Sequence, residues 1–202
     1  MDSGNKNICI FGASSSNIDE KYLLDAYRVG QLTALNGFGL VFGAGDKGVM
    51  GQAARGVTKE GGRLIGVIPE KLNKKGIYYE LCTERIETAT MHERKAKMES
   101  LSCAFIALAG GFGTIEEFME VLTLKQLRYM DPALVLLNTG GYFDPLIAQL
   151  ASCVSEGFTN RDFSSIYYVA STPEEAVAYC ARYRGMEIRD KLLDAGYECD
   201  KK

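Results

Sequence analysis

Short apolar runs alternate with longer amphipathic segments along most of the chain. The apolar run at 8–11 is followed by segment 21–36, in which Leu23, Tyr27 and Leu35 lie on related faces of a helix. Further apolar runs predict strands at 40–42, 64–68, 85–87, 104–108, 133–137 and 166–169. Helices are expected at 21–36, at 49–60, at 91–102, from the loop after 108 to about 129, at 145–156 and at 173–184. The polar stretch 70–82 is expected to be a loop, and segment 196–202 to be frayed or loosely docked.

This alternation predicts an α/β fold. Repeated strand-then-helix units favour a doubly wound parallel sheet with helices on both faces. The whole chain, 1–202, is expected to form a single domain, since its length suits one core and the sequence shows neither a linker nor a repeat. Glycine-rich loops follow several of the predicted strands, at what would be the carboxyl edge of the sheet, where ligands bind in such folds.

Composition narrows the class of protein. The formal net charge of −3 offers no electrostatic basis for binding nucleic acid. No apolar run approaches the roughly 20 residues that a bilayer span requires. The first residues are polar and lack the apolar centre of a signal peptide. We therefore expect a cytoplasmic protein that has neither a nucleic acid nor a membrane as partner.

Cysteine and histidine usage gives little support for metal or nucleophile chemistry. The six cysteines form no Cys-x-x-Cys pair, and Cys9, Cys103 and Cys153 lie in apolar contexts, so buried reduced thiols are expected. His92 is the single histidine, which either a histidine-based zinc site or a Ser-His-Asp triad would need. No Gly-x-Ser-x-Gly turn accompanies it, which argues against a triad. Neither a metal nor a cofactor is expected.

The most informative stretch is 104–117, where an apolar strand leads into a glycine loop and then into a helix. Gly110, Gly111 and Gly113 lack a Cβ, so a ligand can approach their backbone closely. Thr114 stands where an N-cap or first-turn residue would. Because the free N–H groups of a helix start attract anions, this loop is a candidate phosphate site.

Two carboxylates follow this loop directly. Glu116 and Glu117 would favour a helix start through its macrodipole, but that need not place two of them beside three glycines. We expect at least one to bind ligand or take part in catalysis. Segment 91–98 is either a solvated helix start or a second part of the site, and the predicted fold brings Arg94 near both carboxylates.

The loop at 43–48 matches Gly-x-Gly-x-x-Gly but follows the second strand, and no acidic residue ends the next strand. A dinucleotide site is therefore disfavoured against a mononucleotide phosphate site or a simple tight turn. The serines at 14–16 are equally consistent with a ligand contact and with a helix N-cap.

Several motifs in one order resemble a single family. The signature Pro-Gly-Gly-x-Gly-Thr-x-x-Glu appears at 109–117 with Ala109 for the proline, and Met-His-x-Arg-Lys appears at 91–95. Related motifs lie at 48–51, 66–69 and 138–145. From about residue 8 to 179 the chain resembles the "Lonely guy" (LOG) cytokinin riboside 5′-monophosphate phosphoribohydrolases, whose relatives were often labelled lysine decarboxylases.

The resemblance implies a Rossmann-like, nucleotide-binding homodimer that cleaves the N-glycosidic bond of an adenosine-type 5′-monophosphate to free base and ribose 5-phosphate. It implies that Arg94 and Glu117 are catalytic. It implies substrate binding by Lys95, Gly110, Gly111, Phe112, Gly113, Thr114, Ile115, Glu116 and Thr123. Glu117 would stabilise positive charge on the ribose or orient water, and Arg94 would hold the base or assist its departure.

Departures from the family pattern leave the base open between plain and N6-prenylated adenine. Gly76 stands where a substrate-contacting glutamate is common, and Leu124 stands where tryptophan is usual. Ala44 interrupts a usual triple glycine and is expected to keep a ligand at a distance. Two other functions are weighed: a non-catalytic nucleotide or molybdenum-cofactor carrier, which would not need both Arg94 and Glu117, and a pyridoxal phosphate decarboxylase, for which no lysine stands in a recognisable setting.

Overall fold

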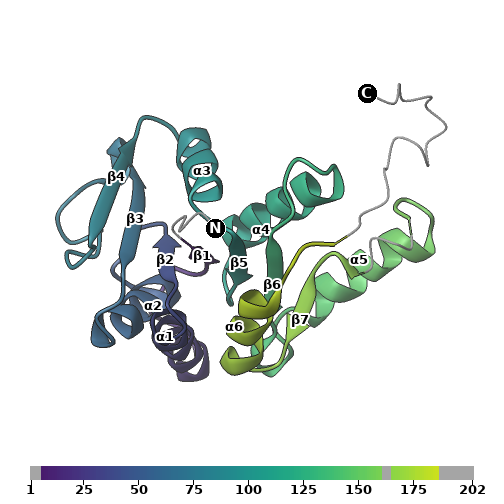
Figure 1. Ribbon diagram of the computed structural model, residues 1–202, viewed down its shortest axis with the longest axis horizontal. Coiled ribbons are helices and arrows are strands. Elements are labelled where there is room, and N and C mark those ends of the chain that lie inside the picture. The colour runs from purple at the N-terminus through teal and green to yellow at the C-terminus, as the bar shows by residue number, and fades with distance from the viewer. Residues whose placement is uncertain (1–5, 161–164, 187–202) are drawn as a thin grey trace.

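The structure is a computed structural model that describes residues 6–160 and 165–186. These residues contain a seven-stranded parallel sheet with the strand order β4-β3-β2-β1-β5-β6-β7 (Figure 1). The strands are β1 (Asn7–Phe11), β2 (Gly39–Phe42), β3 (Leu64–Pro69), β4 (Glu84–Thr88), β5 (Ala104–Ala107), β6 (Ala133–Leu137) and β7 (Tyr168–Ala170). The chain proceeds outward from β1 to β4 and then returns to β5 on the other side of β1. The strand order therefore reverses between β1 and β5, and this is the point where ligands bind in doubly wound sheets.

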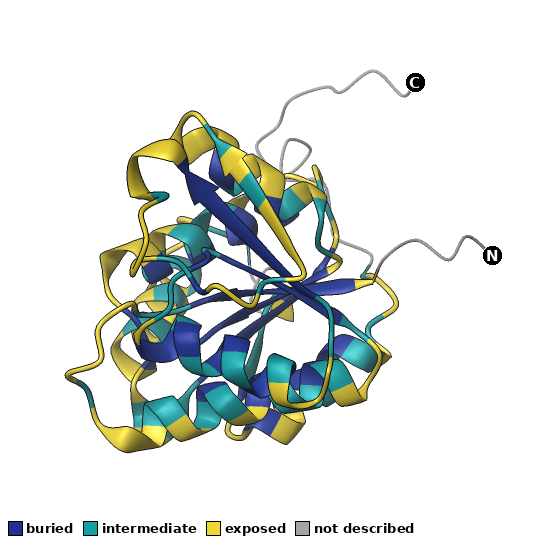
Figure 2. Cartoon of the chain, turned by 90° about the vertical axis from the view of Figure 1, so that its left-hand side faces the viewer, coloured by how far each residue is buried: buried dark blue, intermediate teal, exposed yellow. Residues whose placement is uncertain are grey.

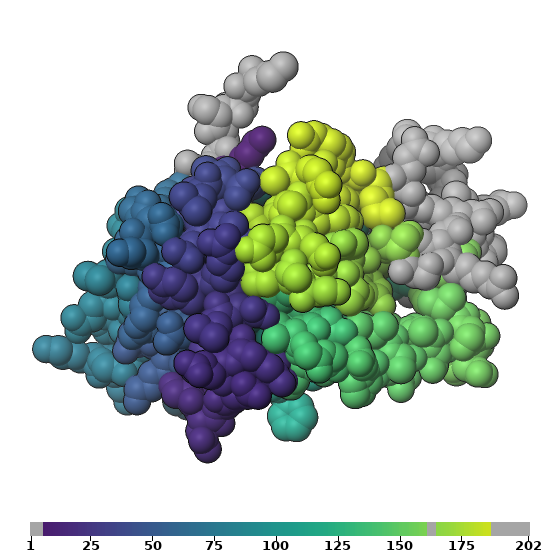
Figure 3. All heavy atoms as spheres, turned by 90° about the horizontal axis from the view of Figure 1, so that it is seen from below, coloured from purple at the N-terminus to yellow at the C-terminus, as the bar shows by residue number. Residues whose placement is uncertain are grey.

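Helices cover both faces of this sheet. They are α1 (Glu20–Leu35), α2 (Gly48–Lys59), α3 (Met91–Ser100), α4 (Phe112–Gln126), α5 (Asp144–Ser155) and α6 (Pro173–Arg182), with short 3₁₀ turns η1 (Glu70–Leu72) and η2 (Thr139–Gly141). One apolar cluster joins the sheet to α1, α2 and α6, and a second joins it to α3, α4 and α5. Figure 2 shows the buried strands between helices whose outer faces are exposed. Figure 3 shows α1 and α2 beside α6 on one side of the molecule.

The central strands are predominantly apolar because they are covered on both faces. All residues of β1, β2, β3, β5 and β6 are buried, as the apolar runs predicted. The edge strand β4 contains three charged residues and a single apolar one, Ile86, and is largely exposed. The doubly wound α/β prediction is therefore confirmed.

The predicted boundaries hold with a few corrections. The last strand covers Tyr168–Ala170 rather than 166–169, because Ile166 packs against the α4 side of the core before the strand begins. Asp19, and not a serine of 14–16, caps α1, and its carboxylate accepts the N–H of Lys21 at 3.0 Å. The predicted loop 70–82 contains the turn η1. The segment 196–202 lies outside the described residues.

The cysteine expectation is correct only in part. Cys9 and Cys180 are buried, whereas Cys82 and Cys153 are half-buried and Cys103 is exposed. Cys103 lies in the turn between α3 and β5, just before the residues that enter the sheet, so its apolar sequence context does not bury it. Burial raises the pKa of the Cys9 thiol well above its usual value and that of Cys180 to about 12, which keeps both protonated. Among the described helices, none combines the length and the apolar character needed to cross a bilayer.

Candidate active site

The glycine loop lies between β5 and α4, on the β5 side of the point where the strand order reverses. The N–H of Leu108 donates to Phe11 at 2.8 Å, and the N–H of Ala13 donates to Ala109 at 3.2 Å, so the loops after β1 and β5 are held together. Gly111 is the N-cap of α4 and has no side chain to cap the helix. The first N–H groups of α4 therefore remain available to an anion.

The three glycines of the loop differ in what a side chain at each position would contact. A Cβ on Gly110 would lie 2.0 Å from the hydroxyl oxygen of Thr114, which is buried, so this glycine is required by packing. A Cβ on Gly111 or Gly113 would meet nothing within 4 Å. A ligand therefore has space to approach the backbone at Gly111 and Gly113, as expected. At Gly110 this space is filled by Thr114.

Arg94 and Glu117 meet beside this loop. Arg94 comes from α3 and Glu117 from α4, and Nη1 of Arg94 donates to Oε1 of Glu117 at 3.4 Å. Nε of Arg94 donates to the carbonyl of Val67 in β3 at 3.2 Å. Both side chains are nearly buried, with 11% and 12% of their surface exposed. The predicted proximity of a guanidinium to these carboxylates is therefore confirmed for Glu117.

Burial sets the protonation of Glu117. Removal from water raises the pKa of this carboxyl to about 7, although the positive charge of Arg94 acts in the opposite direction. A carboxyl with this pKa exchanges its proton near neutral pH, which suits it to acid–base work.

Lys95 follows Arg94 in the chain but has different partners. Its Nζ contacts the carboxylate of Glu116 and lies 2.7 Å from the carboxylate of Glu120, both on α4. Burial would lower the pKa of Lys95, but hydrogen bonds to these two carboxylates outweigh it and raise the pKa. Lys95 thus offsets part of the negative charge of Glu116 on the α3 side.

The loop after β2 makes room for the arginine. A Cβ on Gly43 would lie 1.9 Å from Nη2 of Arg94, so only glycine leaves the guanidinium its place. Sequence reasoning did not assign this role to Gly43, nor the carbonyl contact to Val67, because both depend on how α3 packs over β2 and β3. At Gly43 the loop therefore leaves space for the side chain of Arg94.

Ala44 corrects one expectation. Its side chain is fully buried in the α1–α2 core, and a Cβ on Gly66 would lie 2.9 Å from its methyl group. Its φ is +61°, a left-handed conformation that glycine adopts more easily. The glycine usual at this position therefore relieves backbone strain, and the alanine methyl does not face the site.

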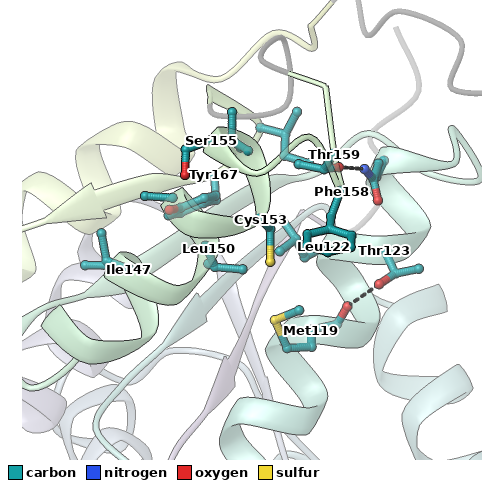
Figure 4. Close-up of a pocket in the computed structure, with 14 residues that line it drawn as sticks. Met119, Leu122, Thr123, Ile147, Leu150, Cys153, Ser155, Phe158, Thr159 and Tyr167 are labelled. Atoms are coloured by element: carbon teal, nitrogen blue, oxygen red, sulfur yellow. Dashed lines mark hydrogen bonds between the residues drawn. The ribbon is translucent and has the colours of Figure 1, made fainter. Parts of the chain in front are cut away.

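Thr123 stands apart from the other predicted site residues. Its hydroxyl donates to the carbonyl of Met119 at 2.8 Å, and it lines an apolar cavity of about 650 Å³ between α4 and α5. Figure 4 shows this cavity, with Met119 and Leu122 on one side and Ile147, Leu150 and Cys153 on the other. Neither Arg94 nor Glu117 lines it.

The remaining predicted residues flank the glycine loop. Phe112 is 95% exposed at the first position of α4, and Ile115 is half-buried one turn further on. His92 is exposed at the start of α3. Within 6–160 and 165–186, no group of three His, Cys, Asp or Glu side chains is arranged to hold a metal ion.

The fold and this site define a Rossmann-like α/β protein with a buried arginine–glutamate pair beside a glycine loop. A family model described as "Possible lysine decarboxylase" matches residues 50–180. The chain is 37% identical over 198 residues to cytokinin riboside 5′-monophosphate phosphoribohydrolase LOG5 of Arabidopsis thaliana, covering 98% of this chain and 86% of that protein. It is 36% identical over 178 residues to the probable enzyme LOGL5 of Oryza sativa subsp. japonica, covering 88% and 72%. The chain belongs to this LOG family.

A solved structure of the molybdenum cofactor carrier protein from Chlamydomonas reinhardtii has the same fold. It superimposes with a TM-score of 0.67 at 24% identity, covering 86% of this chain and 94% of the carrier. At this identity the likeness concerns the fold alone.

Proposed function

We propose that this protein hydrolyses the N-glycosidic bond of an adenosine-type nucleoside 5′-monophosphate, releasing the free base and ribose 5-phosphate. The observation that carries the proposal is the buried pair of Arg94 and Glu117 beside a glycine loop that is open to a ligand. The activity for which its relatives are named supports it.

The 5′-phosphate binds at the start of α4. Gly111 and Gly113 leave space there, and the uncapped N–H groups of the first turn attract its negative charge. Lys95 offsets part of the negative charge of Glu116, which weakens its repulsion of the phosphate. The phosphate contacts supply binding energy that positions the ribose for reaction.

Glu117 acts on the ribose. Breaking the N-glycosidic bond builds positive charge on the sugar, and a nearby carboxylate stabilises that charge or orients the attacking water. With a pKa of about 7, Glu117 can accept a proton from this water at neutral pH. The water's hydroxyl oxygen bonds to the anomeric carbon, and the bonding electrons leave with the base.

Arg94 acts on the leaving base. The carbonyl of Val67 and the carboxylate of Glu117 accept hydrogen bonds from its guanidinium and fix its orientation. The guanidinium is nearly buried and keeps its positive charge. A fixed positive charge stabilises the electron pair that the base carries away. Lys95, Phe112, Ile115 and Thr123 complete the proposed substrate-binding set, of which Thr123 lies on the cavity side of α4.

We also propose that the protein works as a cytoplasmic homodimer. The cavity between α4 and α5 is lined mainly by apolar side chains, and Phe158 on its rim is 83% exposed. An exposed apolar surface of this kind is typical of a subunit interface. A second copy covering it would bring Thr123 into the interface.

The test is hydrolysis of AMP and of N6-isopentenyl-AMP by the purified protein, with free base measured by chromatography. We expect base release that is lost in Arg94→Ala, and the ratio of the two rates identifies the preferred base. A folded protein that binds nucleotide but releases no base from either would contradict the proposal and favour a carrier.

A further inference from the structure

Tyr142 reaches the glycine loop from a different part of the chain. It follows the turn η2 after β6, and its hydroxyl donates to the carbonyl of Gly110 at 2.6 Å. Its ring contacts the rings of Tyr22 and Phe143 edge-on, with centroids 5.5 Å and 5.0 Å away. The hydroxyl is therefore held in place by α1 and by the start of α5.

The neighbouring carbonyls of the loop are also occupied by protein donors. The carbonyl of Ala109 accepts the N–H of Ala13 at 3.2 Å, and that of Gly111 accepts the N–H of Ile115 at 3.2 Å. Three consecutive carbonyls, at 109, 110 and 111, thus have donors from within the protein. Tyr142 is the side chain among these donors, since the other two are backbone N–H groups.

The hydrogen bond from Tyr142 also determines where an N–H points. The described peptide bonds are trans, so the N–H of Gly111 points away from the carbonyl of Gly110 in the same peptide plane. The residues on both sides of this peptide are glycines, whose backbone dihedral angles can change at little energetic cost. Without the hydroxyl, the peptide can turn over and present its carbonyl oxygen where its N–H had been.

We propose that Tyr142 is a positioning residue for phosphate binding: its hydroxyl holds the Gly110–Gly111 peptide with the Gly111 N–H directed at the anion. This inference rests on the proposed function, because it assumes that a nucleotide phosphate binds at the start of α4. A flipped peptide would direct a carbonyl at the phosphate, and the repulsion would weaken binding without touching the Arg94–Glu117 pair.

The experiment is Tyr142→Phe, which removes the hydroxyl and keeps the ring. We expect KM for AMP and the dissociation constant of ribose 5-phosphate to rise together by about five- to tenfold, the size expected from one hydrogen bond. We expect kcat to change by less than about twofold. Tyr22→Phe is the matched control, because it removes the same atom from the adjoining ring and leaves the Gly110 contact in place.

The outcomes separate this inference from the proposed function. If the unmodified protein cleaves AMP and Tyr142→Phe keeps its KM, the positioning role is wrong while the activity stands. If Tyr142→Phe weakens the binding of free adenine as much as the binding of ribose 5-phosphate, the residue has only a general structural role. If the unmodified protein releases no base yet Tyr142→Phe still weakens ribose 5-phosphate binding, the proposed reaction fails and the positioning role survives.

Discussion

The guanidinium of Arg94 lies 3.4 Å from the carboxylate of Glu117, although the two residues are 23 positions apart in the chain. The contact crosses from α3 to α4, on the face of the sheet opposite α1 and α2. It depends on a third residue, since any side chain at Gly43 would occupy the space of the guanidinium.

Gly43→Ala should therefore lower activity by displacing Arg94. A Cβ would lie 1.9 Å from Nη2 and 3.0 Å from Cζ, so the guanidinium must leave its present position. We expect kcat/KM for AMP to fall by about 100-fold, the effect of losing one preorganised charge. In an Arg94→Ala background the same substitution should add little further loss. Equal losses in both backgrounds would mean that Gly43 acts independently of Arg94.

The rate should follow the ionisation of Glu117. Burial raises its pKa to about 7, so a reaction that needs the carboxylate should show kcat/KM rising about tenfold per pH unit below that value and levelling above it. Steady-state kinetics from pH 5 to 9 measure this limb, and Glu117→Gln should lack it. A rate that falls as pH rises through 7 would show that the protonated acid is the active form.

The same shift links Glu117 to stability. Because its pKa is raised from 4.5 to about 7 on folding, the folded state binds the proton more tightly, and this contribution to stability is lost as pH rises from about 4.5 to 7. Glutamine resembles the neutral acid, so Glu117→Gln should not lose this contribution. As the pH rises from 5 to 8, its free energy of unfolding should increase by up to about 3 kcal/mol relative to that of the unmodified protein. Urea unfolding at both pH values measures the gain. A constant difference between the two proteins would be inconsistent with the raised pKa.

Gly110 and Gly113 should respond oppositely to alanine. At Gly110 the Cβ would collide with Thr114, so Gly110→Ala should destabilise the fold by about 1–3 kcal/mol. At Gly113, in the first turn of α4, nothing lies within 4 Å, so alanine should stabilise the helix by up to about 1 kcal/mol. The Gly113 methyl would nevertheless enter the proposed phosphate space and raise KM. Urea unfolding combined with kinetics tests both, and an unchanged KM for Gly113→Ala would place the phosphate elsewhere.

The cavity between α4 and α5 should be a subunit interface. Phe158→Glu puts a charge on its exposed rim, and we expect the mass in solution, measured by light scattering after gel filtration, to halve. Leu24→Glu is the matched control, because Leu24 is an exposed residue of α1 on the opposite face. An unmodified protein that already has the mass of one chain would contradict the homodimer.

Much of this architecture is readable from local sequence. Alternation of apolar runs and helical spacing predicts a doubly wound parallel sheet, because each strand buried on both faces must be apolar throughout. The glycine loop and its two carboxylates can also be predicted from the sequence, because a strand, a turn and a helix start each have a short-range signature.

Other features depend on how distant elements pack. Arg94 and Lys95 are neighbours in sequence, yet one lies against β3 and Glu117 while the other pairs with Glu116 and Glu120. The inward methyl of Ala44, the role of Gly43 and the contact from Tyr142 to Gly110 likewise depend on residues that are distant in the chain. Periodicity is a property of neighbouring residues, whereas the direction of a side chain and the atom it meets are determined by the packing of elements that are remote in the chain.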